Sequence, residues 1–326
     1  MKRTYRRLNV AVEPLQIDQR HLNTKRMMDL MAVSQDDVPL YMESVKRILR
    51  EMRLTQQHTG EAFDYRDFKR RVRDLDLTPG QLAPLNQRLE TLESFMPSVQ
   101  TMYSTKNKGL LVGGTDWKPV PGRLTVVDLS CPCISPETAC SLFNICLGIF
   151  LQEEDGAIGR VFALDEAHKY MSSSPEATIF TDTILSAVRL QRHFGVRVII
   201  STQEPTISTA LLNLCSVTIV HRFTSPEWLR TIRHHLAAAA SNTTRAKTIS
   251  IQGESHKESG TSVTLFDRIV HLKVGEAFLF APSAIIGVDD GGDDDEIVFS
   301  RLGGGSLPIK IRGRLTDDGG KSVLSM

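Results

Sequence analysis

The 326-residue sequence has few cysteines, few aromatic residues and no apolar run long enough to cross a membrane. Its longest apolar stretch, residues 139–151, is interrupted by Asn144 and is shorter than the ~20 residues that a membrane-spanning helix needs. We therefore expect a core helix there and no membrane span. The five cysteines make an odd number, and no secretory leader precedes them. This combination predicts an intracellular, reducing compartment, with nucleus and cytoplasm both open.

The cysteines also lack the spacing of a zinc site. Cys131 and Cys133 flank Pro132, but no second Cys or His pair stands at a zinc-like distance along the sequence. We therefore expect thiols that are buried or inert.

A strong charge of either sign is absent, because the formal net charge is +1. Residues 1–108 carry 19 Lys and Arg against 14 Asp and Glu, and the remainder carries 20 against 24. A mildly basic front permits phosphate contacts but does not require them. Hydrophobic residues make up 41% of the chain, which is enough for a sizeable core.

Apolar spacing divides the chain into a helical front and an α/β back. Residues 1–22 predict a short strand, in which Leu8, Val10 and Val12 alternate, followed by a connection. Residues 23–104 repeat apolar side chains every three or four positions and predict an all-helical insertion. One of its helices is expected to begin at Thr78-Pro79, an N-cap followed by a first-turn proline.

The helical region contains a cluster of cations in the stretch FDYRDFKRRV, residues 63–72. Two interpretations are open: an arginine-rich face for nucleic acid, or a solvated helix surface, which the pattern favours. The cations in question are Arg66, Lys69, Arg70, Arg71 and Arg73.

From residue 105 to residue 326, strands and helices alternate, which predicts an α/β core with a mostly parallel sheet covered on both faces. Polar loops are expected at 237–262 and 287–306. The expected strands are 110–112, 123–129, 161–164, 196–201, 217–220, 277–280 and 309–315, and the expected helices are 136–151, 176–194, 226–236 and 266–272.

Two stretches of this core carry polar side chains directly after apolar strands. The stretch RVFALDEAHKYM, residues 160–171, delivers Asp165 and Glu166, and the stretch VRVIISTQEPT, residues 196–206, delivers Ser201, Thr202 and Gln203. Because the carboxyl ends of parallel strands meet at one edge of a sheet, both tips would face one ligand site.

Together these stretches resemble the Walker B strand and the following sensor strand of P-loop ATPases like HerA and FtsK, which pump or open DNA. The similar pattern is an arginine, two residues and a glycine before an apolar strand and Thr-Gln-x-Pro. Here those residues are Arg192, Gly195, Thr202, Gln203 and Pro205, and the resemblance covers residues 122–236. It implies a RecA-like core, ATP and magnesium as cofactors, a homo-oligomer such as a hexameric ring, and DNA as a partner.

The resemblance also implies roles for single residues. Asp165 would hold magnesium through water, and Glu166 would polarise the attacking water. Gln203 would sense the γ-phosphate, and the neighbouring Thr202 would belong to the nucleotide-binding set.

An arginine finger completes the implied site. Arg192 would reach the nucleotide of a neighbouring subunit, with Arg189 as the alternative, because a planar guanidinium bonds two phosphate oxygens at once. The sequence departs from the family at Glu204, where an arginine is common, and this reverses the local charge.

Residues 165–168 also spell DEAH, as in DEAH-box helicases. Those enzymes need an arginine-bearing motif in a second RecA-like domain, which this sequence does not display. His168 is therefore expected to start a helix near the site rather than to act as the coupling residue of a helicase.

The phosphate-binding half of the site is missing. Backbone N–H groups and a lysine in G-x-x-x-x-G-K-[ST] normally surround the phosphates, and no such motif precedes Asp165. The tail has Gly320-Lys321-Ser322, but Leu315 occupies the place of the first glycine. We therefore expect a RecA-like core that is incomplete at its N-terminal side, either because Met1 is a late start of a longer frame or because the protein is a degenerate homologue.

Two functions follow from this half-site. The first is the C-terminal portion of a HerA/FtsK-like ATPase, which hydrolyses ATP to move along DNA in the complete protein and is inactive alone. The second is a non-catalytic module derived from such an ATPase, which binds a partner or nucleic acid.

Overall fold

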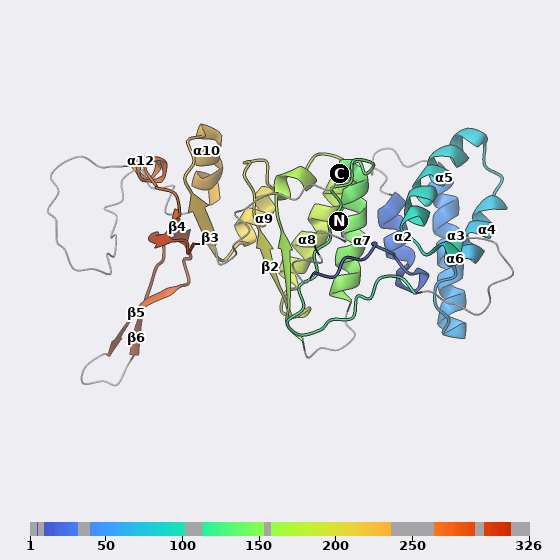
Figure 1. The fold of residues 1–326 in the computed structure, drawn as a ribbon, viewed down its shortest axis with the longest axis horizontal. Coiled ribbons are helices and arrows are strands. Elements are labelled where there is room, and N and C mark those ends of the chain that lie inside the picture. Colours follow the sequence, from blue (N-terminus) through green and yellow to red (C-terminus); the bar gives the residue numbers. More distant parts are fainter. Residues whose placement is uncertain are drawn as a thin grey trace. The chain divides into compact units, whose positions relative to one another are not determined.

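The computed structural model of the chain describes residues 5, 10–31, 40–101, 113–152, 158–235, 264–290 and 297–313 (Figure 1). The chain divides into two compact units, of which the first runs to Ser201 and the second begins at Thr202. This division falls inside the region 105–326 that the sequence predicts as one core.

The first unit opens with helices, as the apolar spacing over residues 23–104 predicts. Local signals fix their starts: the Asp64 carboxylate accepts the backbone N–H groups of Arg66 and Asp67 at 2.9 and 3.2 Å, and the Gln81 side chain accepts the Thr78 N–H at 3.0 Å. The helices are η2 (Gln19–His21), α2 (Thr24–Met31), α3 (Leu40–Thr59), α4 (Tyr65–Arg73), α5 (Pro79–Ser94) and α6 (Ser98–Thr101).

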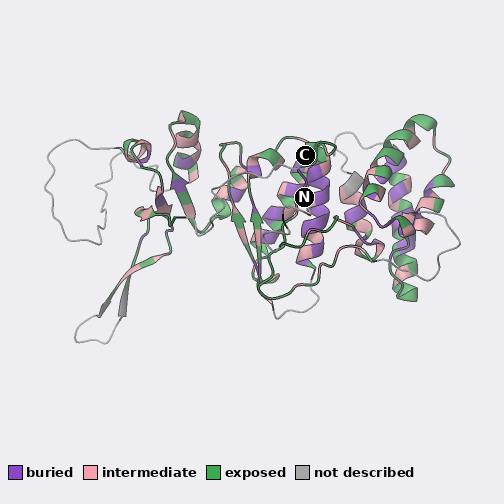
Figure 2. Ribbon diagram, in the orientation of Figure 1, coloured by how far each residue is buried: buried purple, intermediate pink, exposed green. Residues whose placement is uncertain are grey.

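The core of these helices continues into α7 (Pro136–Leu151), which forms as predicted. Tyr65, Phe68 and Leu89 lie in the same buried cluster as Leu142 and Ile145 of α7. Figure 2 shows α7 as largely buried, because α2 packs on it and α8 (Pro175–Arg189) packs on it as well. The helix therefore belongs both to the helical core and to the α/β part of the first unit.

Two parallel strands, β1 (Arg160–Leu164) and β2 (Val196–Ile200), form the sheet of the first unit. Arg160 pairs with Val196 and Leu164 pairs with Ile200, so the two strands start and end together. Both strands and the connecting α8 confirm the expected β–α–β alternation. Side chains alternate between the two faces: Leu164 and Val196 are buried, whereas Val161 and Ile199 are 59% and 58% exposed.

Several expected elements of the first unit are wrong. Residues 123–129 form no strand and pair with none of the described strands, and Leu124 and Val126 are 87% and 77% exposed. Val10–Val12 form no strand either, while residues 6–9 and 110–112 lie outside the described residues. The helix expected at 176–194 ends at Arg189, and residues 190–195 form a turn in which Gly195 has φ +57°.

The second unit combines short helices with antiparallel strands. Its larger sheet has the order β3-β4-β7, both pairs antiparallel, and its other strand pair is β5-β6. The helices are α9 (Thr209–Leu214), α10 (Pro226–His235) and α12 (Leu265–Val270); the strands are β3 (Thr218–His221), β4 (Glu276–Phe280), β5 (Ile285–Asp290), β6 (Ile297–Arg301) and β7 (Leu307–Lys310). Val220, Ile232, Ile269, Phe278 and Phe280 share a buried cluster.

The strands and helices expected near 217–220, 226–236, 266–272 and 277–280 are therefore confirmed, and the last expected strand forms earlier, at Leu307–Lys310, on a sheet edge. The polar loop expected at 287–306 is wrong, because β5 and β6 occupy much of it. The loop expected at 237–262 lies outside the described residues.

The chain is an α/β protein with small sheets. Among the described strands the parallel arrangement is limited to β1 and β2, so the expectation of a mostly parallel sheet is wrong for these residues. None of the described helices is both long and apolar enough to cross a bilayer.

The expectation of buried or inert thiols is met by burial at two of the five cysteines. Cys140 and Cys146 are buried, and burial raises the pKa of Cys140 to about 11 and that of Cys146 to about 12. Cys131, Cys133 and Cys215 are exposed free thiols, so they are not buried, and their inertness stays a prediction.

Candidate functional site

The carboxyl tips of β1 and β2 are joined by three hydrogen bonds. The Ser201 hydroxyl donates to Oδ1 of Asp165, the Ser201 N–H donates to the Leu164 carbonyl at 2.9 Å, and the Ala167 N–H donates to the Ser201 carbonyl at 2.9 Å. Asp165 and Ser201 are both exposed. The parallel register therefore produces a solvent-accessible carboxylate that a hydroxyl from the neighbouring strand holds in place.

Glu166 follows in a strained backbone conformation. Its φ and ψ are 51° and 44°, and it is the only non-glycine residue with positive φ in the described part of the chain. Such a conformation costs about 1–3 kcal/mol and persists where surrounding bonds impose it. Here the Glu166 N–H donates to Oδ1 of Asp165 at 3.0 Å, and the Glu166 carboxylate lies 3.5 Å from Nδ1 of His168.

Glu166 thus turns the chain sharply at the end of β1. The next residues form the short helix η3 (Ala167–Tyr170), so His168 starts a helix beside the site, as expected. Strain in a non-glycine residue at a strand tip is typical of functional sites, and it falls on the residue to which the sequence analysis gives the catalytic role.

Tyr170 is a further member of the site that the sequence analysis did not single out. Burial raises the pKa of its hydroxyl, and Cys140 and the carboxylates of Asp128, Asp165 and Glu166 raise it further. Its neutral hydroxyl therefore lies in the field of three carboxylates.

Ser201 was expected at the tip of β2, as the first polar residue after its apolar run, but without a role of its own. Asp128 was missed, although it interrupts the apolar run of residues 123–129. The position of Tyr170 depends on η3, whose packing against α7 places the Tyr170 ring edge-on to Phe143 at 5.0 Å. No periodicity predicts that contact.

Arg189 and Arg192 lie at the opposite end of the same strand pair. Arg189 is the last residue of α8 and Arg192 is in the turn that leads into β2, and both are exposed. Five strand residues at ~3.3 Å each separate that end from the tips, which is roughly 16 Å. Within one chain, neither arginine accompanies Asp165.

Thr202 and Gln203 belong to the second unit. The Thr202 hydroxyl donates to the Glu204 carbonyl at 3.1 Å and accepts the Glu204 N–H at 3.3 Å, which makes a compact turn. The Gln203 carbonyl accepts the indole N–H of Trp228 at 2.9 Å, and the residue is exposed. Trp228 therefore anchors the backbone at Gln203.

The residues at the strand tips suit one of the two implied cofactors. Magnesium keeps most of its water and is commonly bound through one or two carboxylates, and Asp165 offers one that is exposed and oriented. No three His, Cys, Asp or Glu side chains among the described residues lie close enough to hold a metal ion by themselves.

The described residues include no phosphate-binding loop for ATP. In the described residues no glycine-rich loop connects a strand to a following helix, and the sequence has no P-loop motif before Asp165. The described residues thus include an oriented, exposed carboxylate at the strand tips and no phosphate cradle.

Comparison with known proteins adds no relative. No model of a protein family matches the sequence, and no curated protein matches it.

Proposed function

We propose that the chain carries the metal-and-water half of a nucleotide site of the HerA/FtsK kind. In this function a P-loop from another segment or subunit holds ATP, and hydrolysis drives movement along DNA. The observation that supports the proposal most is the hydrogen bond between Asp165 and Ser201 across the tips of two parallel strands, next to the strained Glu166.

Each side chain has a physical task in this proposal. Asp165 orients water around the magnesium ion, which bound ATP brings and which supplies charge neutralisation of the phosphates. The Glu166 carboxylate accepts a proton from the attacking water, and the resemblance assigns the sensing of the γ-phosphate to Gln203, which belongs to the second unit. Thr202 contributes its hydroxyl to the nucleotide-binding set.

The arginines support an oligomeric site. Because Arg189 and Arg192 lie roughly 16 Å from the tips of their own strands, a guanidinium from this position serves the nucleotide of a neighbouring subunit. A ring of identical subunits, such as a hexamer, supplies that geometry at every site.

The alternative function is a non-catalytic module that binds a partner or nucleic acid and donates Arg192 to another ATPase. The missing phosphate cradle favours it. Nucleotide affinity separates the two, because this module needs no nucleotide of its own.

The test is ATP turnover with magnesium, measured on the chain alone and on the chain fused behind a strand–P-loop–helix segment. We expect no turnover from the chain alone and turnover from the fusion, with Glu166→Gln lowering the rate by a factor of roughly 10²–10⁴, the usual contribution of general base catalysis. A fusion that binds ATP and turns it over equally well with Glu166→Gln would refute the role of Glu166. Tight magnesium–ATP binding by the chain alone would refute the half-site.

A further inference from the structure

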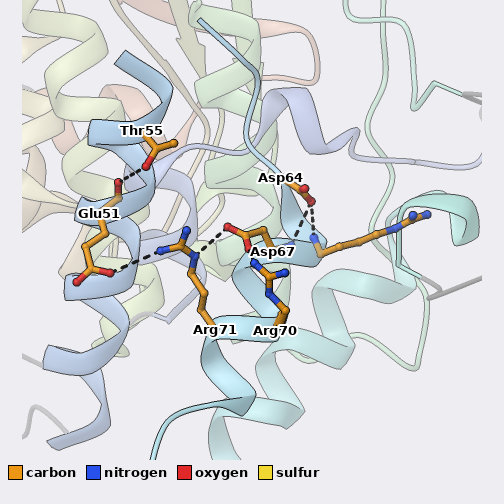
Figure 3. Close-up of polar contacts among 7 residues, drawn as sticks. Glu51, Thr55, Asp64, Asp67, Arg70 and Arg71 are labelled. Atoms are coloured by element: carbon orange, nitrogen blue, oxygen red, sulfur yellow. Dashed lines mark hydrogen bonds and ion pairs between the residues drawn. The ribbon is translucent and has the colours of Figure 1, made fainter. Parts of the chain in front are cut away.

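The cations of α4, in which the sequence suggests a possible nucleic-acid face, are occupied within the protein. Arg70 pairs with Asp67, and Arg71 donates to Asp67 at 2.8 Å and lies 3.6 Å from Glu51 (Figure 3). The Arg70 side chain remains 66% exposed, so α4 is a solvated helix surface, as the pattern favours, and its pairs remove two cations from the alternative nucleic-acid face.

Two further cations of α4 also have partners within the protein. The Lys69 ammonium pairs with Glu93, and the Arg66 guanidinium donates to the carbonyls of Val99 and Gln100 at the end of α6. A hollow of about 340 Å³ between α3 and α4 is lined by Asp64, Asp67 and Glu61 as well as by arginines, so its charge is mixed. Neither the helix nor the hollow presents unpaired positive charge.

The adjacent helix α3 differs. Arg47, Arg50 and Arg53 are exposed and form no ion pair or hydrogen bond with any residue in the described part of the chain. They recur every three residues, so Arg47 lies opposite the buried face that includes Val45 and Leu49, and Arg53 lies at the edge of that face. At 1.5 Å of rise per residue they extend along ~9 Å of the helix.

The acidic residues of α3 do not neutralise this set. Glu43 bonds Lys46 at 2.8 Å, and this bond lowers the pKa of Glu43 most, with a smaller Coulombic contribution from Arg50. Glu51 faces Arg71 of α4. The three arginines therefore concentrate positive charge that no other side chain of the helix pairs.

We infer that Arg47, Arg50 and Arg53 form a surface that binds the phosphodiester backbone of nucleic acid. One guanidinium group can bond two oxygens of one phosphate. Several arginines along one helix can therefore contact successive phosphates of a nucleic-acid backbone. Leu54, which is 53% exposed on the same side of α3, offers apolar contact to sugar or base. This surface is separate from the tips of β1 and β2, and the inference does not depend on the proposed nucleotide chemistry.

An anionic membrane fits the same surface poorly. A helix that lies in a bilayer interface buries its apolar face in lipid, whereas the apolar face of α3 is buried in the protein core through Tyr41, Val45, Leu49 and Met52.

The experiment is fluorescence anisotropy of the whole chain with a labelled 20-base-pair duplex over a series of salt concentrations. We expect binding whose logarithm falls linearly with the logarithm of salt concentration. The triple variant Arg47→Gln, Arg50→Gln, Arg53→Gln should weaken binding at least tenfold near 0.1 M salt and reduce the slope by about 2.7, at ~0.9 per phosphate contact. Glutamine retains helix propensity and removes no buried contact, so the variant should fold.

The matched control is Lys46→Gln, Arg70→Gln, Arg71→Gln, which removes the same formal charge from side chains that already have carboxylate partners. The inference requires this control to keep a slope near that of the unmodified chain. Equal loss in both triple variants would overturn it in favour of net charge alone. No duplex binding by the unmodified chain, equal competition by poly-glutamate, or binding to anionic phosphatidylserine vesicles without duplex binding would each overturn it as well.

Discussion

Two parts of the first unit differ in how completely they bury their apolar side chains and pair their charged ones. These parts are the helices between Thr24 and Thr101 and the strand pair β1–β2. The helices bury Phe68, Leu85 and Leu89 and pair the cations of α4 internally. The strand pair leaves Val161 and Ile199 largely exposed on one face and holds Glu166 in a strained conformation. Parallel sheets are normally covered on both faces, so the strand pair is the less completely packed of the two parts.

Truncation of a buried leucine in the helical core should have the largest effect on the free energy of unfolding. Leu89→Ala removes a side chain that is 1% exposed in the helical core and should lower the free energy of unfolding by about 2–5 kcal/mol. The matched change Leu124→Ala removes a side chain that is 87% exposed and should change it by less than about 0.5 kcal/mol. Urea unfolding of both variants measures the difference, and equal losses would contradict the contrast.

The next effect concerns the close approach of two chain segments that support the helices. A Cβ atom at Gly114 would lie 2.4 Å from the Gln16 carbonyl oxygen and 2.7 Å from the Asp18 nitrogen. Gly114→Ala should therefore destabilise the first unit by roughly 1–3 kcal/mol.

The neighbouring glycine provides the control for this prediction. Gly113→Ala meets its nearest atom, Oδ2 of Asp18, at 3.6 Å, which is an ordinary contact. Thermal unfolding should show a clear loss for Gly114→Ala and almost none for Gly113→Ala. A similar loss in both variants would mean that the close approach at Gly114 is not what limits stability.

Relief of backbone strain at the strand tips should stabilise the protein, whereas the Leu89 and Gly114 variants should destabilise it. Glu166→Gly should raise the free energy of unfolding by roughly 0.5–1 kcal/mol, because a left-handed conformation costs ~1–2 kcal/mol and the added freedom of glycine in the unfolded chain costs ~0.4–1 kcal/mol. Glu176→Gly, in the first turn of α8, should instead lower it by up to about 1 kcal/mol. The denaturant midpoints of both variants measure these changes. A lower free energy of unfolding for Glu166→Gly would argue against stored strain at Glu166.

The smallest effect is a pair of pH dependences of stability, one from Asp18, which precedes η2, and one from Asp29 of α2. Burial alone would raise the pKa of Asp18, but hydrogen bonds from the N–H groups of Arg20 and Gly114 and from Gln100 outweigh it and keep the pKa below its ordinary value of 3.8. Its stabilisation is thus present above about pH 3.8 and is lost as the pH falls through the lower value in the folded state. Burial raises the pKa of Asp29, despite the charges of Lys25 and Arg26, so the Asp29 carboxylate reduces stability above that raised pKa.

Asparagine variants should separate the two cases. Asp18→Asn should lower the unfolding temperature at pH 7, and the difference from the unmodified chain should vanish in strong acid. Asp29→Asn should raise the unfolding temperature at pH 7, and its advantage should shrink as the pH falls toward 3.8. A pH-independent difference in either variant would contradict the assignment to that carboxylate.

Local signals explain what the sequence predicted well. The Thr78-Pro79 start of α5 and the apolar runs of β1 and β2 depend on neighbours within a few residues, and the structure has all of them. The tip residues Asp165 and Glu166 follow directly from the end of β1.

What the sequence could not predict depends on partners that are distant along the chain. Residues 123–129 have the composition of a strand, but a strand needs a neighbouring backbone to pair with. The α4 cations read as a basic cluster until α3 and α5 bring Glu51 and Glu93 beside them. For the same reason the unpaired Arg47, Arg50 and Arg53 were not singled out.

The most direct test of the central claim is Mn²⁺-induced line broadening in the NMR spectrum of the whole chain, with Mn²⁺ standing in for Mg²⁺ at the strand tips. We predict saturable broadening centred on the amides of Asp165, Glu166 and Ser201. This broadening should disappear with Asp165→Asn and persist with Asp182→Asn, which neutralises an exposed carboxylate on α8. Broadening that is absent from these amides, or unchanged by Asp165→Asn, would contradict the claim that the tips of β1 and β2 form the metal-and-water half of a nucleotide site.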